Sequence, residues 1–159
     1  MYNQKSKDLL VKKLEFEDFN RTTCSFYKYV NIVDPSTFRD KVYEEFDILE
    51  ILGRVYIAKE GVNVQISVPE KNWGLFLKLI SSIKLFNDVD IKTAIGDGIS
   101  FYKLVVKVKK EIVAYNIPKS KFNMDVVGEH LDTKQFNEAI KNSNTTVIDM
   151  RNIYESEVG

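Results

Sequence analysis

The sequence is poor in the residues from which metal centres and disulfides are built. Its 159 residues include one cysteine, Cys24, and one histidine, His130. A single cysteine excludes an internal disulfide and any zinc site made of cysteines, and one imidazole cannot hold a metal alone. A nucleophilic cysteine needs a histidine or a helix N-terminus that lowers its pKa, and nothing near Cys24 indicates either. We therefore predict no metal site and no catalytic role for Cys24, and no motif for a flavin, haem or other cofactor is identifiable in the sequence.

The chain also lacks net charge and long apolar runs. Lys plus Arg and Asp plus Glu both number 23, so any contact with a polyanion must come from a local patch. The apolar runs are far shorter than the roughly 20 residues that cross a bilayer, and "MYNQKSKDLLVKK" has no signal-peptide character. With 44% hydrophobic residues, the chain can still form a core. We expect a globular, cytoplasmic protein with no membrane partner.

After a charged arm at 1–21, the pattern predicts alternating strands and helices. "SFYKYVNI" predicts a strand at 25–33. "DPSTFRDKVYEEFDIL" predicts a helix with Asp34 as N-cap and Pro35 at its first position. Its apolar stripe should face a sheet and consists of Phe38, Val42, Phe46 and Leu49. "RVYIAKEGVNVQISV" then predicts a hairpin that turns near Gly61, with Gly53 closing the preceding unit.

A second helix and a last strand complete this unit. "EKNWGLFLKLISSI" predicts a helix whose apolar face carries Trp73, Phe76, Leu77, Ile80 and Ile83. "IGDGIS" predicts a turn, and "FYKLVVKVKKEIVAYN" predicts a long fourth strand. The resulting β-α-β-β-α-β order over 22–117 is the ferredoxin-like plan of the α+β class. We expect one antiparallel sheet with both helices on one face and the other face open.

The pattern of the last part of the chain predicts a linker and the start of a second domain. Residues 118–128 break all periodicity and carry proline, lysine and glycine, which indicates a linker. In "LDTKQFNEAI" Asp132 and Gln135 form a capping box, and "TTVIDM" is typical of a short buried parallel strand. One helix and one strand cannot bury enough apolar surface to offset the conformational entropy that is lost when they become ordered. We interpret 129–159 as the start of an incomplete α/β domain, the alternative being a tail packed on the first domain.

Several segments carry a family resemblance. "RTTCSFYKY", "DPSTFRD", "GRVYIAKEGVNVQISVP", "VVGEHL" and "VIDMRNIYESEVG" together resemble the rhodanese-domain tRNA uridine hydroxylases (TrhO-like) of bacteria. The resemblance implies an acylphosphatase-like domain followed by the truncated start of a rhodanese domain. It also implies an enzyme that forms 5-hydroxyuridine at the tRNA wobble position with molecular oxygen as co-substrate. The family's catalytic cysteine lies beyond "VIDMRNIYESEVG", so this chain would hold no catalytic residue and would be inactive alone.

The same resemblance gives the end of the chain a structural role. Asp149, Arg151 and Glu155 match the rhodanese loop, where they are expected to orient the backbone and pair with neighbours rather than do chemistry. The missing C-terminal rhodanese region is the expected partner of 129–159. The sequence predicts no oligomeric state.

The open face of the predicted sheet is a candidate RNA-binding surface. Alternation places Asn63, Gln65 and Ser67 opposite the apolar face of the hairpin. If Tyr27 and Tyr29 share that side, aromatic rings and cations would combine to hold tRNA. The candidate residues are Tyr27, Tyr29, Arg54, Phe101, Lys103, Lys107, Lys109 and Lys121. The alternative is that the lysines keep an exposed strand soluble and prevent edge pairing.

Other functions are weighed against tRNA hydroxylation. A rhodanese-type sulfurtransferase remains an alternative because one fold serves several chemistries. For the isolated chain, a non-catalytic RNA- or protein-binding module is a further alternative. Acylphosphatase activity is excluded, because Asp34 and Pro35 stand where a phosphate-binding loop needs backbone N–H donors, and the carboxylate would repel the phosphate.

Overall fold

The structure is a computed structural model that describes residues 6–94, 100–113, 128–150, 153 and 157. The chain divides into two compact units, Met1–Ile117 and Pro118–Gly159. The first unit contains α1 (Lys7–Glu15), β1 (Arg21–Tyr29), α2 (Pro35–Ile48), β2 (Leu52–Ala58), β3 (Gly61–Pro69), α3 (Trp73–Ser82), β4 (Lys92–Thr93) and β5 (Leu104–Val108). Short 3-10 turns at Glu70–Asn72 and Lys84–Phe86 flank α3.

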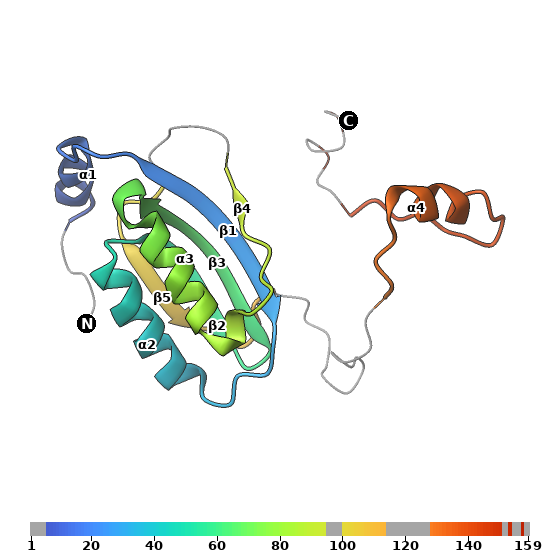
Figure 1. Cartoon of the computed structure of the whole chain (residues 1–159), viewed down its shortest axis with the longest axis horizontal. Helices are drawn as coiled ribbons and strands as arrows, with labels where there is room; N and C mark the ends of the chain where they lie inside the picture. Colours follow the sequence, from blue (N-terminus) through green and yellow to red (C-terminus); the bar gives the residue numbers. More distant parts are fainter. Residues whose placement is uncertain (1–5, 95–99, 114–127, 151–152, 154–156, 158–159) are drawn as a thin grey trace. The chain divides into compact units, whose positions relative to one another are not determined.

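The strands form one sheet in the order β4-β1-β3-β2-β5 (Figure 1). From β1 to α3 the elements follow the predicted order, and two strands, β4 and β5, then stand where one was predicted. The prediction of a purely antiparallel sheet is wrong, because β5 pairs with β2 in parallel. The stretch predicted as a long fourth strand forms only this five-residue fifth strand. The fourth strand is β4, whose two residues are too few to show any periodicity.

Strand β1 begins earlier in the chain than predicted. It spans Arg21–Tyr29 rather than 25–33, and its ladder with β3 runs from Arg21 opposite Pro69 to Tyr29 opposite Gly61. The partner strand therefore sets the limits of β1, since a strand extends only as far as its backbone exchanges hydrogen bonds with a neighbouring strand. The predicted turn at 95–99 lies outside the described residues.

Helices α2 and α3 both cover the same face of the sheet, as predicted (Figure 1). Phe46 of α2 and Phe76 of α3 are fully buried between the helices and the sheet, with ring centroids 6.2 Å apart in an edge-on arrangement. The placement of Leu77 on the core face is wrong, because its side chain is 42% exposed. Leu77 lies beside the narrow stripe of Phe76, Ile80 and Ile83 through which α3 packs.

Asp34 caps α2 as predicted. Its carboxylate accepts hydrogen bonds from the backbone N–H groups of Ser36 and Thr37 at 3.0 and 3.1 Å, and from the Thr37 hydroxyl at 2.6 Å. These hydrogen bonds, that from the Thr37 side chain first, hold the pKa of Asp34 below its usual value of 3.8. The charged form of Asp34 is therefore the one that the folded protein favours.

We expect Asp34→Ala to lower the urea midpoint clearly, and Asp34→Asn to lower it less because an amide oxygen still caps the helix. Because folding depresses the pKa of Asp34, its charge stabilises the protein fully above the unfolded-state pKa, near 3.8. That contribution is lost as the pH falls through the lower folded-state pKa. Urea titrations from pH 7 downward should show the difference between wild type and Asp34→Asn shrinking below about pH 4. A difference that is constant with pH would contradict this account.

The second unit contains α4 (Thr133–Ala139). The predicted capping box is confirmed, with the backbone N–H of each of Asp132 and Gln135 donating to the other's side chain at 2.8 Å. The strand predicted at 145–150 does not form within the described residues of this chain. Its apolar side chains are exposed instead, Val147 at 59%, Ile148 at 72% and Met150 at 88%. None of the described residues from 128 onward is buried.

Candidate nucleic-acid interface

The face of the sheet opposite α2 and α3 carries polar and aromatic side chains, and we call it the open face. Its members follow from the register, because paired residues point to the same side. Tyr27 pairs with Asn63, whereas the neighbouring Phe26 pairs with the buried Val64. Tyr27 therefore lies on the open face, and Tyr29, two residues further along, shares that side. The question that alternation alone left open is settled by this pairing.

Two rows of side chains cross the open face from strand to strand. The first row contains Lys107, Tyr56, Asn63 and Tyr27. The second row contains Val105, Arg54, Gln65, Ser25 and Lys92. Neighbouring members of a row are about 4.8 Å apart, the spacing of paired strands. Residues from four or five different strands thus form one continuous surface.

Three cations of the open face lie on β2, on β5 or just beyond β5, and we call Arg54, Lys107 and Lys109 the cationic half. All three side chains are exposed. Lys109 continues the pairing just beyond β5, since its backbone N–H donates to the Ile57 carbonyl at 2.8 Å. The Lys109 ammonium lies 5.2 Å from the ring centroid of Tyr56. Neither β2 nor β5 contains an acidic residue, so this charge is not neutralised within its own strands.

Strands β1 and β3 border a groove of about 620 Å³ beside the cationic half. Tyr27, Asn63 and Gln65 line it from the open face, and residues 88–90 and Lys92 line its outer side. The Lys28 ammonium donates to the Asn87 carbonyl, and the Lys92 ammonium pairs with Asp90 at 2.5 Å. The hydrogen bond to Asp90 raises the pKa of Lys92 above its usual value. The Lys28 contact ties the segment before β4 to β1, whereas the Lys92–Asp90 pair is local to that segment and β4.

The structure separates the predicted RNA-binding residues into groups. Tyr27, Tyr29, Arg54, Lys107 and Lys109 lie together on the open face. Phe101 and Lys103 precede β5 and are half-buried, and Lys121 lies outside the described residues.

Tyr56 lies on the open face but is not among the residues predicted from the sequence. Its signal was present, because Arg54 and Tyr56 alternate with the apolar Val55 and Ile57 in β2. Lys92 is a second unpredicted member, which the pairing of β4 with β1 brings opposite Ser25.

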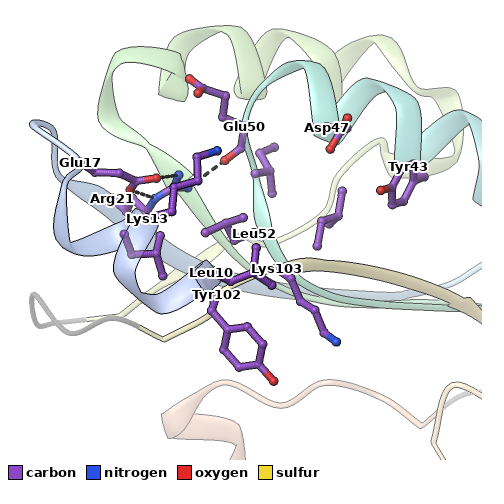
Figure 2. A pocket seen from close by; sticks show the side chains of 13 residues that line it. Leu10, Lys13, Glu17, Arg21, Tyr43, Asp47, Glu50, Leu52, Tyr102 and Lys103 are labelled. Carbon is purple, nitrogen blue, oxygen red and sulfur yellow. Dashed lines mark hydrogen bonds and ion pairs between the residues drawn. The ribbon is translucent and has the colours of Figure 1, made fainter. Parts of the chain in front are cut away.

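A second hollow, of about 290 Å³, lies beside α1 and is held together by Arg21 (Figure 2). Arg21 donates through Nε and Nη2 to the Glu17 carboxylate at 2.6 and 2.7 Å, and through Nη1 to the Glu50 carbonyl at 2.8 Å. Its guanidinium is thus engaged by the protein itself and ties Glu17, just after α1, to the Glu50 carbonyl between α2 and β2. Lys103 lines this hollow as well, with its ammonium 5.7 Å from the Tyr102 ring centroid.

The groups that could support catalysis in this unit are not arranged for it. Cys24 is buried in the core, and burial raises the pKa of its thiol to about 12, so the thiolate is not available at neutral pH. At the start of α2, the backbone N–H groups that would have to bind a phosphate are already bonded to Asp34. Among the described residues, no three histidine, cysteine or acidic side chains gather closely enough to hold a metal ion.

The described helices include none with the length and apolar character that crossing a membrane requires. In the second unit, Asp149 is exposed, whereas Arg151 and Glu155 lie outside the described residues. The expectation of a structured rhodanese loop there stays a prediction.

The chain is similar over its whole length to known proteins, and a family model matches its first unit. The chain is 44% identical over 160 residues to a tRNA uridine(34) hydroxylase of Leptospira interrogans, covering 100% of this chain and 44% of that protein. Proteins of the same name from Photorhabdus laumondii and Buchnera aphidicola subsp. Baizongia pistaciae are 41% and 38% identical, again over 100% of this chain. The chain spans about half the length of these relatives. Residues 21–112 match the model of the UPF0176 acylphosphatase like domain, and the chain therefore belongs to that family.

Proposed function

We propose that this chain is part of an enzyme that hydroxylates uridine 34 of tRNA to 5-hydroxyuridine, with molecular oxygen as co-substrate. The observation that carries the proposal is the match of the whole chain, at 38% to 44% identity, to relatives named for this reaction. A tRNA substrate also implies a cytoplasmic location. Within the enzyme, the role of the first unit is to hold tRNA on its open face.

The open face suits RNA because it combines the two kinds of group that RNA-binding sheets use. Tyrosine rings offer surfaces for stacking with bases, and the cationic half offers charge for phosphates. Solubility alone accounts for lysines on an exposed strand, but it does not account for Tyr27, whose side chain is 69% exposed. We therefore favour a binding surface over a merely solvated one.

The second unit is proposed to be the beginning of a rhodanese domain, with Asp149, Arg151 and Glu155 as loop residues of structural importance. Its exposed Val147, Ile148 and Met150 support the proposal, since a parallel sheet would bury such a run on both faces. We propose that the catalytic thiol lies in the portion of the relatives that this chain does not match. That placement agrees with the buried, protonated state of Cys24.

The reaction is tested in cells by removing the gene that encodes this chain and analysing tRNA nucleosides by mass spectrometry. Loss of 5-hydroxyuridine and of the nucleosides made from it supports the proposal. Loss of thiolated nucleosides with 5-hydroxyuridine intact would show a sulfurtransferase instead.

The role of the open face is tested by charge reversal. We expect Arg54→Glu, Lys107→Glu and Lys109→Glu together to lower the affinity of the chain for tRNA at least about tenfold at low salt, because each lost phosphate contact weakens binding. The matched control reverses three exposed lysines on the opposite, helical side of the unit: Lys41, Lys78 and Lys84. Both variants change the net charge equally, so equal losses of affinity in a filter-binding titration would contradict a specific surface.

A further inference from the structure

We infer that the open face divides the work of binding, with phosphates on the cationic half and bases in the groove beside Tyr27. This inference rests on the proposed function, because it assumes that the open face binds RNA. It goes further by assigning a different part of the RNA to each half and by naming the form of RNA that fits. The ligand is a single-stranded segment with unstacked bases.

Charge is distributed unevenly across the open face. The cationic half carries three positive side chains, Arg54, Lys107 and Lys109, and its strands contain no acid. The four charged residues of the groove balance one another, with Lys28 and Lys92 against Asp88 and Asp90. The Lys92 ammonium is also paired with Asp90. A phosphate is therefore attracted to β2 and β5, and it gains no net attraction at the groove.

The groove offers what a neutral base needs. Tyr27 lines it with a 69% exposed side chain, and the Tyr29 ring meets the Tyr27 ring edge-on at 6.3 Å between centroids. In an edge-to-face pair Tyr29 can cover at most one face of the Tyr27 ring, and with 69% of Tyr27 exposed the other face is available for stacking. Asn63 and Gln65 line the same groove, and their amides both donate and accept hydrogen bonds. Such amides suit the mixed donor and acceptor edge of a base.

The two halves are adjacent and have a fixed order. Tyr56 and Arg54 on β2 are joined through Asn63 and Gln65 on β3 to Tyr27 and Ser25 on β1. Strands β2 and β1 are therefore two strand spacings apart, about 10 Å. An RNA segment whose sugar-phosphate backbone follows β2 and β5 therefore directs its bases across β3 toward the groove.

A duplex does not satisfy this arrangement. Its bases are stacked on one another inside the helix, and the deep major groove of double-stranded RNA does not admit side chains. Tyr27 can stack only on a base that has left the helix, as bases in loops do. The open face should therefore prefer single-stranded RNA to a duplex of the same sequence.

The test uses the whole chain and fluorescence anisotropy over a range of salt concentrations. Three labelled ligands are compared: a single-stranded RNA, the same RNA in a duplex, and the same backbone without bases. We expect the single strand to bind at least about tenfold more tightly than the duplex, in line with the energy of one or two stacked bases. Equal or tighter binding of the duplex would overturn the inference.

Variants separate the two halves. We expect Tyr27→Ala with Gln65→Ala to weaken single-strand binding by about tenfold, to leave the salt slope unchanged and not to affect the base-free backbone. Tyr27→Phe should retain the affinity, because it keeps the stacking ring. Replacing Arg54, Lys107 and Lys109 with glutamine should instead reduce the slope of log affinity against log salt by about 2.

The outcomes distinguish this inference from the proposed function. A Tyr27 variant that loses affinity equally for the base-free backbone would overturn the division of the face while leaving RNA binding intact. If the wild-type chain binds none of the three ligands at low salt, the proposed role of the open face fails, and the inference fails with it. Urea titration of each variant checks that it is folded, which we expect because all of the substituted side chains are exposed.

Discussion

Replacing Phe76 with alanine should lower the free energy of unfolding by about 3 to 5 kcal/mol, the usual cost of removing a buried ring. Phe76 is fully buried, and its ring centroid lies 6.2 Å from that of Phe46 and 5.3 Å from that of Trp73. The alanine variant therefore leaves a cavity at the place where both helices meet the sheet. Urea denaturation followed by circular dichroism measures the loss.

The neighbouring residue supplies the matched control. Leu77 belongs to the same helix, and its side chain is 42% exposed. We expect Leu77→Ala to cost less than about 1 kcal/mol, since much of the side chain is already in water and alanine favours the helix. If both variants were equally destabilised, α3 would pack through a broader face than the structure shows.

Replacing Gly61 with alanine should destabilise the protein by about 3 kcal/mol, because the backbone there is both strained and crowded. Gly61 has φ +151°, a conformation that other residues rarely adopt. A Cβ at this position would lie 2.1 Å from the Lys28 carbonyl oxygen and 3.0 Å from the Tyr29 Cα. Both contacts are with the backbone of β1, so relief requires the strands to separate.

A second glycine makes the comparison specific. Gly74 lies in α3, and a Cβ built there would meet no atom within 4 Å. Gly74→Ala should therefore raise the free energy of unfolding by up to about 1 kcal/mol through better helix propensity. Opposite signs for the two variants in parallel urea titrations are the expected result. A stabilised Gly61→Ala variant would show that β1 and β3 can shift apart at little cost.

Prediction from the sequence succeeded where a signal is local and long enough to repeat. The start of α2 was predicted from Asp34 and Pro35, and the α4 capping box was predicted from Asp132 and Gln135. It failed for β4, whose two residues carry no period, and for β5, whose alternating pattern continues beyond the five residues that pair with β2. Gly53, expected to close the helical unit, lies inside β2, where a Cβ would meet the Gln65 carbonyl at 2.3 Å.

The candidate site shows the same division. Alternation in the sequence predicted that the lysines near β5 share one face of the sheet. Which face carries Tyr27 followed only from its pairing with Asn63. The neutral groove depended on residues 88–92 lying against β1, far from it in the chain. Neither feature has a local signal, because each is created by contacts between distant segments.

The amino-acid sequence alone determined the helices, the hairpin and the family to which this chain belongs, since caps, turns and hydrophobic periods act over a few residues. The tertiary structure decided the mixed sheet, the limits of β1 and β5 and the membership of the open face. The physical reason is that a strand has edges and faces only in relation to its neighbours. Backbone hydrogen bonds between distant segments determine both where a strand ends and which of its side chains lie together.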